Sequence, residues 1–181
     1  MKENKYMRNI IKSDSFKWGA ILGSIVGGGT ETFNQIKSVK GIKTLDSNER
    51  GALSEARAEK QYGGEAQKSY LNGEEVPLNT QGATRPDIVR NVDGHIEAIE
   101  VKNYNLRSEA SRRGYIKSLR REVQSRNINL PEGSTQRIAI DINGRNYSKE
   151  ELNEIIQFTQ SNLSDIYPNI PIDTIPPLLA N

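Results

Sequence analysis

Residues 49–62 carry the spacing of an amphipathic helix, with Leu53 and Ala56 on the expected inner face and Arg57 on the outer one. Ser47 precedes this stretch and belongs to the residue types that cap helix N-termini, and two consecutive glycines follow it. The pattern therefore predicts one helix, closed at both ends.

A β-hairpin is predicted near the centre of the chain. Residues 85–92 and 95–104 are strand-like, and they flank Asp93-Gly94, a pair that tolerates the positive φ angles of a tight turn. In the second strand Glu100 and Lys102 share one face. Both faces of that strand also carry apolar side chains, which is typical of a central strand covered on both sides.

Helices and strands continue to alternate after the hairpin, beginning with Ile116, Leu119 and Val123 at helical spacing. The expected elements are a helix over 108–126, a strand over 136–142, a helix opened by a capping box at Ser148 and Glu151, and a short edge strand near the C-terminus. This order indicates an α/β layered domain over residues 46–181.

Residues 1–45 differ from the rest, since they are basic and helical in composition and contain a run of three glycines. We expect a helical N-terminal extension here. Its apolar stretch, 16–29, is too short and too rich in glycine to span a bilayer, so no stable membrane insertion is expected. The favoured interpretation is a packed helix, and the alternative is a helix that lies on a membrane surface.

The composition narrows the chemistry. Among 181 residues, 25 Lys and Arg stand against 23 Asp and Glu, so the net charge is only +2. The chain has no cysteine and a single histidine, His95, which excludes thiolate zinc sites, cysteine nucleophiles and two-histidine mechanisms. Carboxylates, lysine and backbone carbonyls remain, and these favour a hard cation such as Mg²⁺ over Zn²⁺.

One group of residues in the hairpin could carry out hydrolysis. Asp87 lies near the start of the first strand, and Glu100 and Lys102 lie on the second. Two carboxylates can hold a divalent metal that polarises a phosphate and acidifies a water, while a lysine orients the water or neutralises charge. The Val101 carbonyl is a further candidate oxygen ligand.

Arg85-Pro86-Asp87 followed by Glu100-Val101-Lys102, on a hairpin preceded by a glutamate-bearing helix, resembles the PD-(D/E)XK nuclease superfamily. The resemblance covers roughly residues 47–165 and implies a restriction-endonuclease-like core, a mixed central β-sheet flanked by helices. It implies that Asp87 and Glu100 bind metal and that Lys102 is the catalytic lysine. Glu55 matches the additional acidic residue of the metal site, with Glu59 as its competitor. The implied metal is Mg²⁺, with Mn²⁺ or Zn²⁺ as alternatives.

Two further stretches, GALSEARAEKQYGG at 51–64 and IAIDINGRNYS at 138–148, are similar to C-terminal nuclease domains of bacterial polymorphic and contact-dependent inhibition toxins. This similarity implies a module that is secreted or delivered from the cell surface and acts in the cytoplasm of the target cell. It also implies a cognate immunity protein as partner, and a pre-toxin or linker role for residues 1–45.

The helix after the hairpin is predicted to contact the substrate. Between residues 107 and 126 it carries seven basic residues against two acidic ones, a composition suited to phosphates. The candidate contacts are Arg112, Arg113, Lys117, Arg120 and Arg121. DNA is the favoured substrate on grounds of resemblance, and transfer RNA is the alternative, because both present the same phosphate geometry to a metal.

Two other functions stay open at this point. In a non-catalytic nucleic-acid-binding domain, Glu100 and Lys102 would form a structural ion pair, and Asp87 would be a turn residue that follows a proline. In a membrane-active toxin, residues 16–29 would carry the activity. A charged pair on a strand that is otherwise apolar is costly without a purpose, which favours the nuclease.

Overall fold

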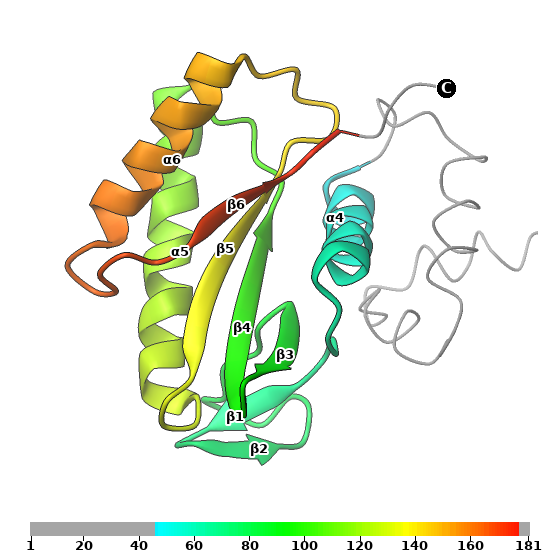
Figure 1. Ribbon diagram of the computed structural model, residues 1–181, viewed down its shortest axis with the longest axis vertical. Helices are drawn as coiled ribbons and strands as arrows, with labels where there is room; N and C mark the ends of the chain where they lie inside the picture. Colours follow the sequence, from blue (N-terminus) through cyan, green and yellow to red (C-terminus); the bar gives the residue numbers. More distant parts are fainter. Residues whose placement is uncertain (1–45, 178–181) are drawn as a thin grey trace, which may run out of the picture.

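The computed structural model describes residues 46–177, which form three helices and six strands (Figure 1). The elements follow one another as α4 (Ser47–Tyr62), β1 (Ser69–Leu71), β2 (Glu74–Val76), β3 (Ile88–Val92), β4 (His95–Lys102), α5 (Glu109–Asn129), β5 (Thr135–Asp141), α6 (Lys149–Leu163) and β6 (Ile172–Ile175). The predicted order of helices and strands is confirmed, and a small hairpin is added whose tight turn at Asn72-Gly73 was predicted but whose strands, β1 and β2, were not.

The main sheet has the strand order β3-β4-β5-β6 and is mixed. β4 pairs antiparallel with β3 and parallel with β5, and β6 continues the parallel part. Helix α4 covers one face of this sheet, and α5 and α6 cover the other (Figure 1). The α/β class is therefore confirmed, and β4 is an inner strand covered on both sides, as its sequence predicts.

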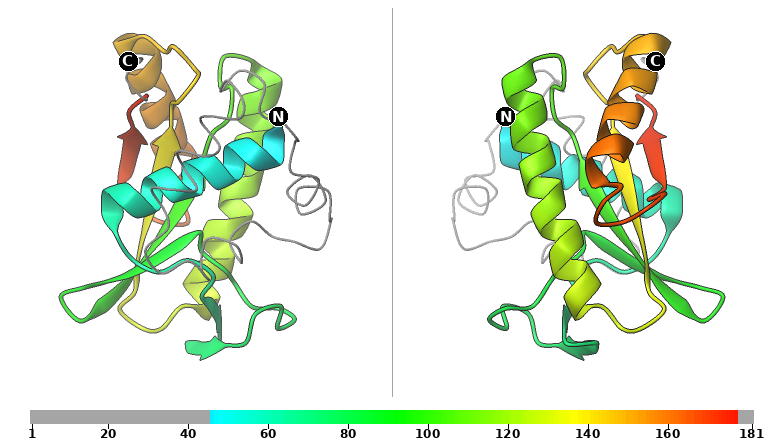
Figure 2. Two further views of the ribbon diagram at one scale, coloured as in Figure 1. Left: turned by 90° about the vertical axis from the view of Figure 1, so that its right-hand side faces the viewer. Right: turned by 90° about the vertical axis from the view of Figure 1, so that its left-hand side faces the viewer.

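Each face of the sheet has its own apolar core. On the α5 and α6 face, Leu119 and Val123 pack with Ile138 and Ile140 of β5. On the α4 face, Ala58 packs with β-strand side chains that include Ile99 and Val101. Helices α5 and α6 lie side by side over the first core (Figure 2). The predicted apolar stripe of α5 is confirmed, because all three of its residues are buried.

Local signals in the sequence set most of the element boundaries. Asp93 and Gly94 both adopt positive φ, +52° and +87°, as a tight hairpin turn requires. The capping box of Ser148 with Glu151 opens α6 as predicted. The predicted cap of α4 was wrong by one residue, since Asp46 rather than Ser47 accepts the backbone N–H groups.

The predicted outer face of α4 was also wrong at Arg57. This side chain is buried, pairs with Asp141 at the end of β5, and donates to the carbonyl of Pro176. Ala56, which was expected inside, is only half-buried. A long cation can reach a buried carboxylate across the helix flank, and the spacing of apolar residues alone does not reveal this.

The expected N-terminal extension, residues 1–45 with the apolar stretch 16–29, lies outside the described residues, as do residues 178–181. In the part of the chain between 46 and 177, none of the helices combines the length and the apolar character needed to cross a membrane.

Candidate active site

Two acidic residues come together where β3 begins beside β4. Asp87 lies in a bend one residue before β3, at the end of β3 where Ile88 pairs with Ile99 of β4, the neighbour of Glu100. Oδ2 of Asp87 accepts a hydrogen bond of 2.7 Å from the backbone N–H of Val101. This bond fixes Asp87 against the strand that carries Glu100.

Glu55 approaches Asp87 from the α4 side. Burial, and after it the charge of Asp87, raises the pKa of Glu55 to about 7, while Arg85 and Lys102 act in the opposite direction. Between the two glutamates considered on this helix, the interaction with Asp87 is shown for Glu55. The pKa of Asp87 is raised as well, chiefly by burial.

Lys102 and Glu100 form an ion pair on their shared face of β4, which is the contact that a non-catalytic domain would also make. The pair is buried rather than solvated, since the side chain of Glu100 is 4% exposed and that of Lys102 is 12% exposed. Nζ of Lys102 also lies 3.1 Å from Oε2 of Glu122 on α5. Lys102 thus lies between two carboxylates, one from the strand and one from the helix.

Arg126, one helical turn beyond Glu122, provides the second cation at Glu100. Its Nη2 donates to Oε2 of Glu100, and its side chain is only 2% exposed. Burial lowers the pKa of Arg126 to about 10, and the charge of Asp87 acts in the opposite direction. Arg126 therefore remains a cation at neutral pH and compensates the buried charge of Glu100.

The balance of charges around Asp87 explains why Glu55 resists ionisation. We call the following seven residues the charged cluster: the carboxylates Glu55, Asp87, Glu100 and Glu122, and the cations Arg85, Lys102 and Arg126. An ionised Glu55 is a buried negative charge whose cost Arg85 and Lys102 offset only in part, since its pKa remains raised. Because such a charge is costly when buried, the cluster favours either a proton on Glu55 or one more cation.

The donor chemistry of the cluster fits a hard divalent cation. Glu55 and Asp87 offer carboxylate oxygens, and the Val101 carbonyl points to the same side of β4 as the N–H group that binds Asp87. Oxygen donors of this kind suit Mg²⁺ or Mn²⁺. Within residues 46–177, no three His, Cys, Asp or Glu side chains already form a group able to hold a metal, because Glu100 faces Lys102 and Arg126 instead.

The five basic residues predicted to contact nucleic acid fall into two sets. Arg120 donates two hydrogen bonds of 2.7 and 2.6 Å to Asp165, and Arg112 lies 5.6 Å from the centre of the Phe158 ring, so both are directed toward α6. The other three are exposed and spaced by four residues along one side of α5: Arg113, Lys117 and Arg121. We call these three the basic stripe.

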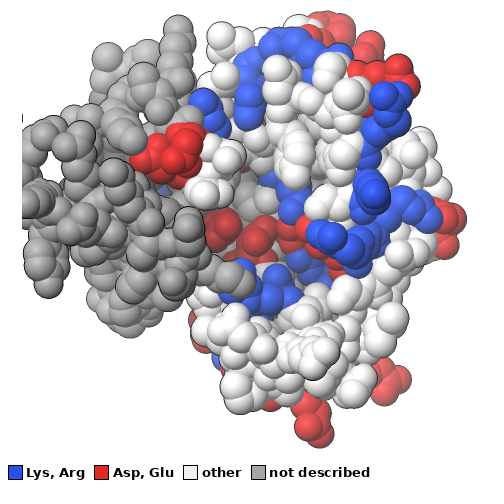
Figure 3. Space-filling model, turned by 180° about the vertical axis from the view of Figure 1, so that it is seen from behind, with Lys and Arg blue, Asp and Glu red and all other residues white. Residues whose placement is uncertain are grey.

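Charged side chains gather round a hollow on the back of the molecule (Figure 3). Acidic atoms lie in the hollow, and Lys and Arg side chains border it.

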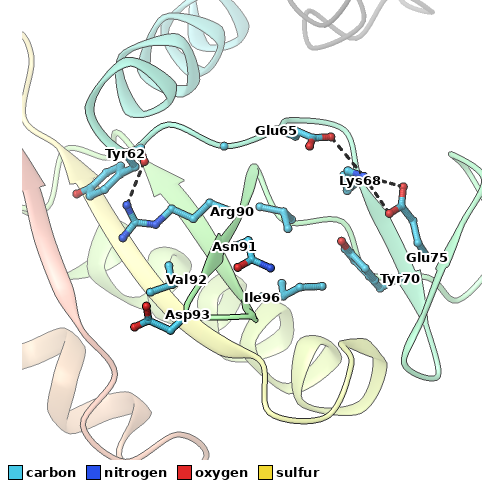
Figure 4. Close-up of a pocket in the computed structure, with 12 residues that line it drawn as sticks. Tyr62, Glu65, Lys68, Tyr70, Glu75, Arg90, Asn91, Val92, Asp93 and Ile96 are labelled. Atoms are coloured by element: carbon cyan, nitrogen blue, oxygen red, sulfur yellow. Dashed lines mark hydrogen bonds and ion pairs between the residues drawn. The ribbon is translucent and has the colours of Figure 1, made fainter.

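A cavity of about 750 Å³ lies elsewhere, beside the outer edge of β3 (Figure 4). None of the charged cluster lines it. Several of its charged side chains are already paired: Lys68 lies 3.0 Å from Glu75, and Arg90 lies 2.6 Å from Glu97. We therefore assign the chemistry to the charged cluster, which holds the residues of the motif, and not to this cavity.

The structure brings together all four predicted catalytic residues, and it adds two that were not predicted as site residues, Glu122 and Arg126. A signal for Arg126 exists in the sequence. The apolar stripe of α5 runs through Leu119 and Val123, and its next position is Arg126. A charged residue at a core position indicates a buried partner.

No family model, curated protein or solved structure matches this chain. The resemblance to the PD-(D/E)XK superfamily therefore depends on the motif residues themselves. The restriction-endonuclease-like fold stays a prediction, and so do the activity, the metal and the partners.

Proposed function

We propose that this chain is a metal-dependent endonuclease of the PD-(D/E)XK type that hydrolyses phosphodiester bonds in nucleic acid. The observation that carries the proposal is the meeting of the four motif residues in one buried place: Asp87 is bound to the backbone of β4 beside the Glu100 and Lys102 pair, and Glu55 approaches Asp87 from α4. Burial and the charge of Asp87 raise the pKa of Glu55, and perturbed carboxyl groups of this kind are typical of functional sites.

Each residue of the motif has a role in this proposal. Glu55, Asp87 and Glu100, with the Val101 carbonyl, would hold the cation, which when bound polarises the phosphate and lowers the pKa of a water. Lys102 would lie beside the reacting phosphate, where it stabilises developing negative charge and orients the attacking water. Burial strengthens this interaction, because less water screens it.

The basic stripe supports nucleic acid as the proposed substrate class. Its three side chains are exposed and lie on α5, the helix whose Glu122 contacts Lys102. Contacts of this type bind phosphates regardless of sequence. DNA is the favoured substrate, and transfer RNA is the alternative. Arg112 and Arg120 are left out of this surface because they are directed toward α6.

The proposed biological role is a toxin module of interbacterial competition. The similarity of 51–64 and 138–148 to nuclease toxin domains supports it. On this proposal the module is secreted or delivered from the cell surface, acts in the cytoplasm of the target cell, and is neutralised in the producing cell by a cognate immunity protein. Residues 1–45 would then be a pre-toxin segment or linker.

A second candidate is a non-catalytic nucleic-acid-binding domain. The ion pair between Glu100 and Lys102 favours it, since that contact is the one expected of structural charges. Binding would then survive chelation of metal and would not change in Glu100→Gln.

Incubation of the protein with plasmid DNA and with total transfer RNA separates the two candidates. Each substrate is combined with Mg²⁺, Mn²⁺ or EDTA, and the wild type is compared with Lys102→Ala and Asp87→Asn. The nuclease predicts cleavage of one substrate that requires metal and disappears in both variants. Retention of nucleic acid in a gel without cleavage in any metal would favour the binding domain.

A further inference from the structure

Helix α5 faces the E-x-K motif with two charged residues of its own. Glu100 and Lys102 lie two residues apart on one face of β4, and Glu122 and Arg126 lie four residues apart on one side of α5. The partners are complementary, because Arg126 contacts Glu100 and Glu122 contacts Lys102. Every charge of the motif is thus met by the opposite charge from the helix.

We propose that Glu122 and Arg126 are positioning residues for the nuclease site, with Arg126 orienting Glu100 for the metal and Glu122 retaining Lys102 beside the substrate. The inference rests on the proposed function. It assigns to α5 a part in catalysis beyond covering the sheet and contacting nucleic acid.

The two carboxylate oxygens of Glu100 have different partners, so one can bind a metal while the other stays bound to Arg126. Arg126 holds Oε2, and Lys102 holds Oε1. Lys102 has a second carboxylate at 3.1 Å, on Glu122, so it can give up Oε1 without losing an ionic partner. Ser118 fixes that carboxylate with a hydrogen bond of 2.8 Å to its other oxygen. A cation can therefore take Oε1 while Arg126 still holds Oε2.

Arg126 is suited to hold the Glu100 carboxylate in one fixed orientation. It is buried to 2% exposure, and no protein group within residues 46–177 accepts from its Nε or Nη1. Glu100 is thus its one hydrogen-bonding partner through the guanidinium. Groups that orient metal ligands typically change metal affinity by about 10-fold to 100-fold when they are removed.

Calorimetric titration with Mn²⁺ tests the role of Arg126 without measuring activity. Arg126→Gln should weaken binding about 10-fold relative to wild type, and Arg126→Lys, which keeps the charge, should recover part of the loss. Arg120→Gln is the matched control on the same helix and should bind as wild type does. If Arg126→Gln binds Mn²⁺ equally or more tightly, Arg126 merely competes with the metal for Glu100, and the inference is wrong.

Glu122→Gln gives an independent test, because its side chain is partly exposed and the fold tolerates the change more readily than at Arg126. On the nucleic acid that the wild type cleaves, kcat should fall about 10-fold while KM and the Mn²⁺ affinity stay unchanged. Glu109→Gln serves as its control. Unchanged kcat would overturn the role of Glu122, even if Arg126→Gln does not fold.

Failure of the inference can be told apart from failure of the proposed function. If wild type and Asp87→Asn both fail to bind Mn²⁺, the metal site itself is refuted and the positioning roles with it. If wild type binds and Asp87→Asn does not, the site stands, and the Arg126 and Glu122 variants alone decide whether α5 positions the motif.

Discussion

Replacing Glu55 with Gln should make the protein more stable at alkaline pH and leave it nearly unchanged at acidic pH. Gln has the shape of a protonated glutamate but cannot ionise. In the folded chain the pKa of Glu55 is raised from 4.5 to about 7 by burial and by the charge of Asp87. The folded state therefore binds a proton that the unfolded state has already released between these two pH values.

The sign and the size of the effect follow from this difference. Stability falls as pH rises wherever the folded state binds more protons than the unfolded state. The shift from 4.5 to about 7 corresponds to about 3 kcal/mol, and about 2 kcal/mol of it is lost between pH 5 and pH 8. Glu55→Gln should lack this loss, so the excess of its free energy of unfolding over that of wild type should be about 2 kcal/mol larger at pH 8 than at pH 5.

Urea unfolding in the presence of EDTA, at pH 5 and pH 8, measures the difference directly. Glu59→Gln, one turn further along the same helix, is the matched variant that removes a carboxylate from α4 but leaves Glu55 in place. Asp87→Asn should also reduce the pH dependence, because the charge of Asp87 is one cause of the shift. If the difference in free energy of unfolding between Glu55→Gln and wild type stays constant with pH, the raised pKa of Glu55 is refuted.

Three further outcomes follow from the same contacts. Arg126→Met should lower the free energy of unfolding by about 3 kcal/mol, since it leaves buried Glu100 with one cation. Adding Glu100→Gln to this variant should restore much of the lost stability, as measured by urea titration. If the effects of the two single substitutions simply add, Arg126 and Glu100 are not energetically coupled and the prediction is wrong. In scanning calorimetry at pH 8, millimolar Mg²⁺ should raise the melting temperature of wild type but not that of Asp87→Asn. An equal rise in both proteins would mean that the cation binds elsewhere. Gly64→Ala should destabilise the fold by several kcal/mol, because Gly64 has φ +105° and an added Cβ would lie 2.6 Å from the carbonyl oxygen of Val89; an unchanged melting temperature would contradict this.

Much of the fold could be predicted because its signals are local. The Asp93-Gly94 turn fixes the hairpin, and alternation along 95–104 places Glu100 and Lys102 on one face, since neither depends on distant residues. The capping box at Ser148 is equally local. Burial of β4 on both sides could be inferred from its apolar residues on both faces.

The features that could not be predicted are charged side chains whose partners lie far away along the chain. The inward position of Arg57 requires Asp141, which lies 84 residues later. The role of Arg126 requires Glu100, and the direction of Arg120 requires Asp165. A long charged side chain has the same local pattern whether it is solvated or meets a buried carboxylate, so only the tertiary structure distinguishes the two.

The central claim is that the charged cluster hydrolyses phosphodiester bonds with the help of a divalent cation. The most direct measurement is the cleavage rate of an end-labelled nucleic acid in Mg²⁺ by wild type, by Lys102→Met and by the control Lys117→Met on the basic stripe. We expect Lys102→Met to abolish cleavage while it still binds the substrate, and Lys117→Met to keep cleavage and weaken binding modestly. Cleavage by Lys102→Met at the wild-type rate, or equally fast cleavage in EDTA, would contradict the claim.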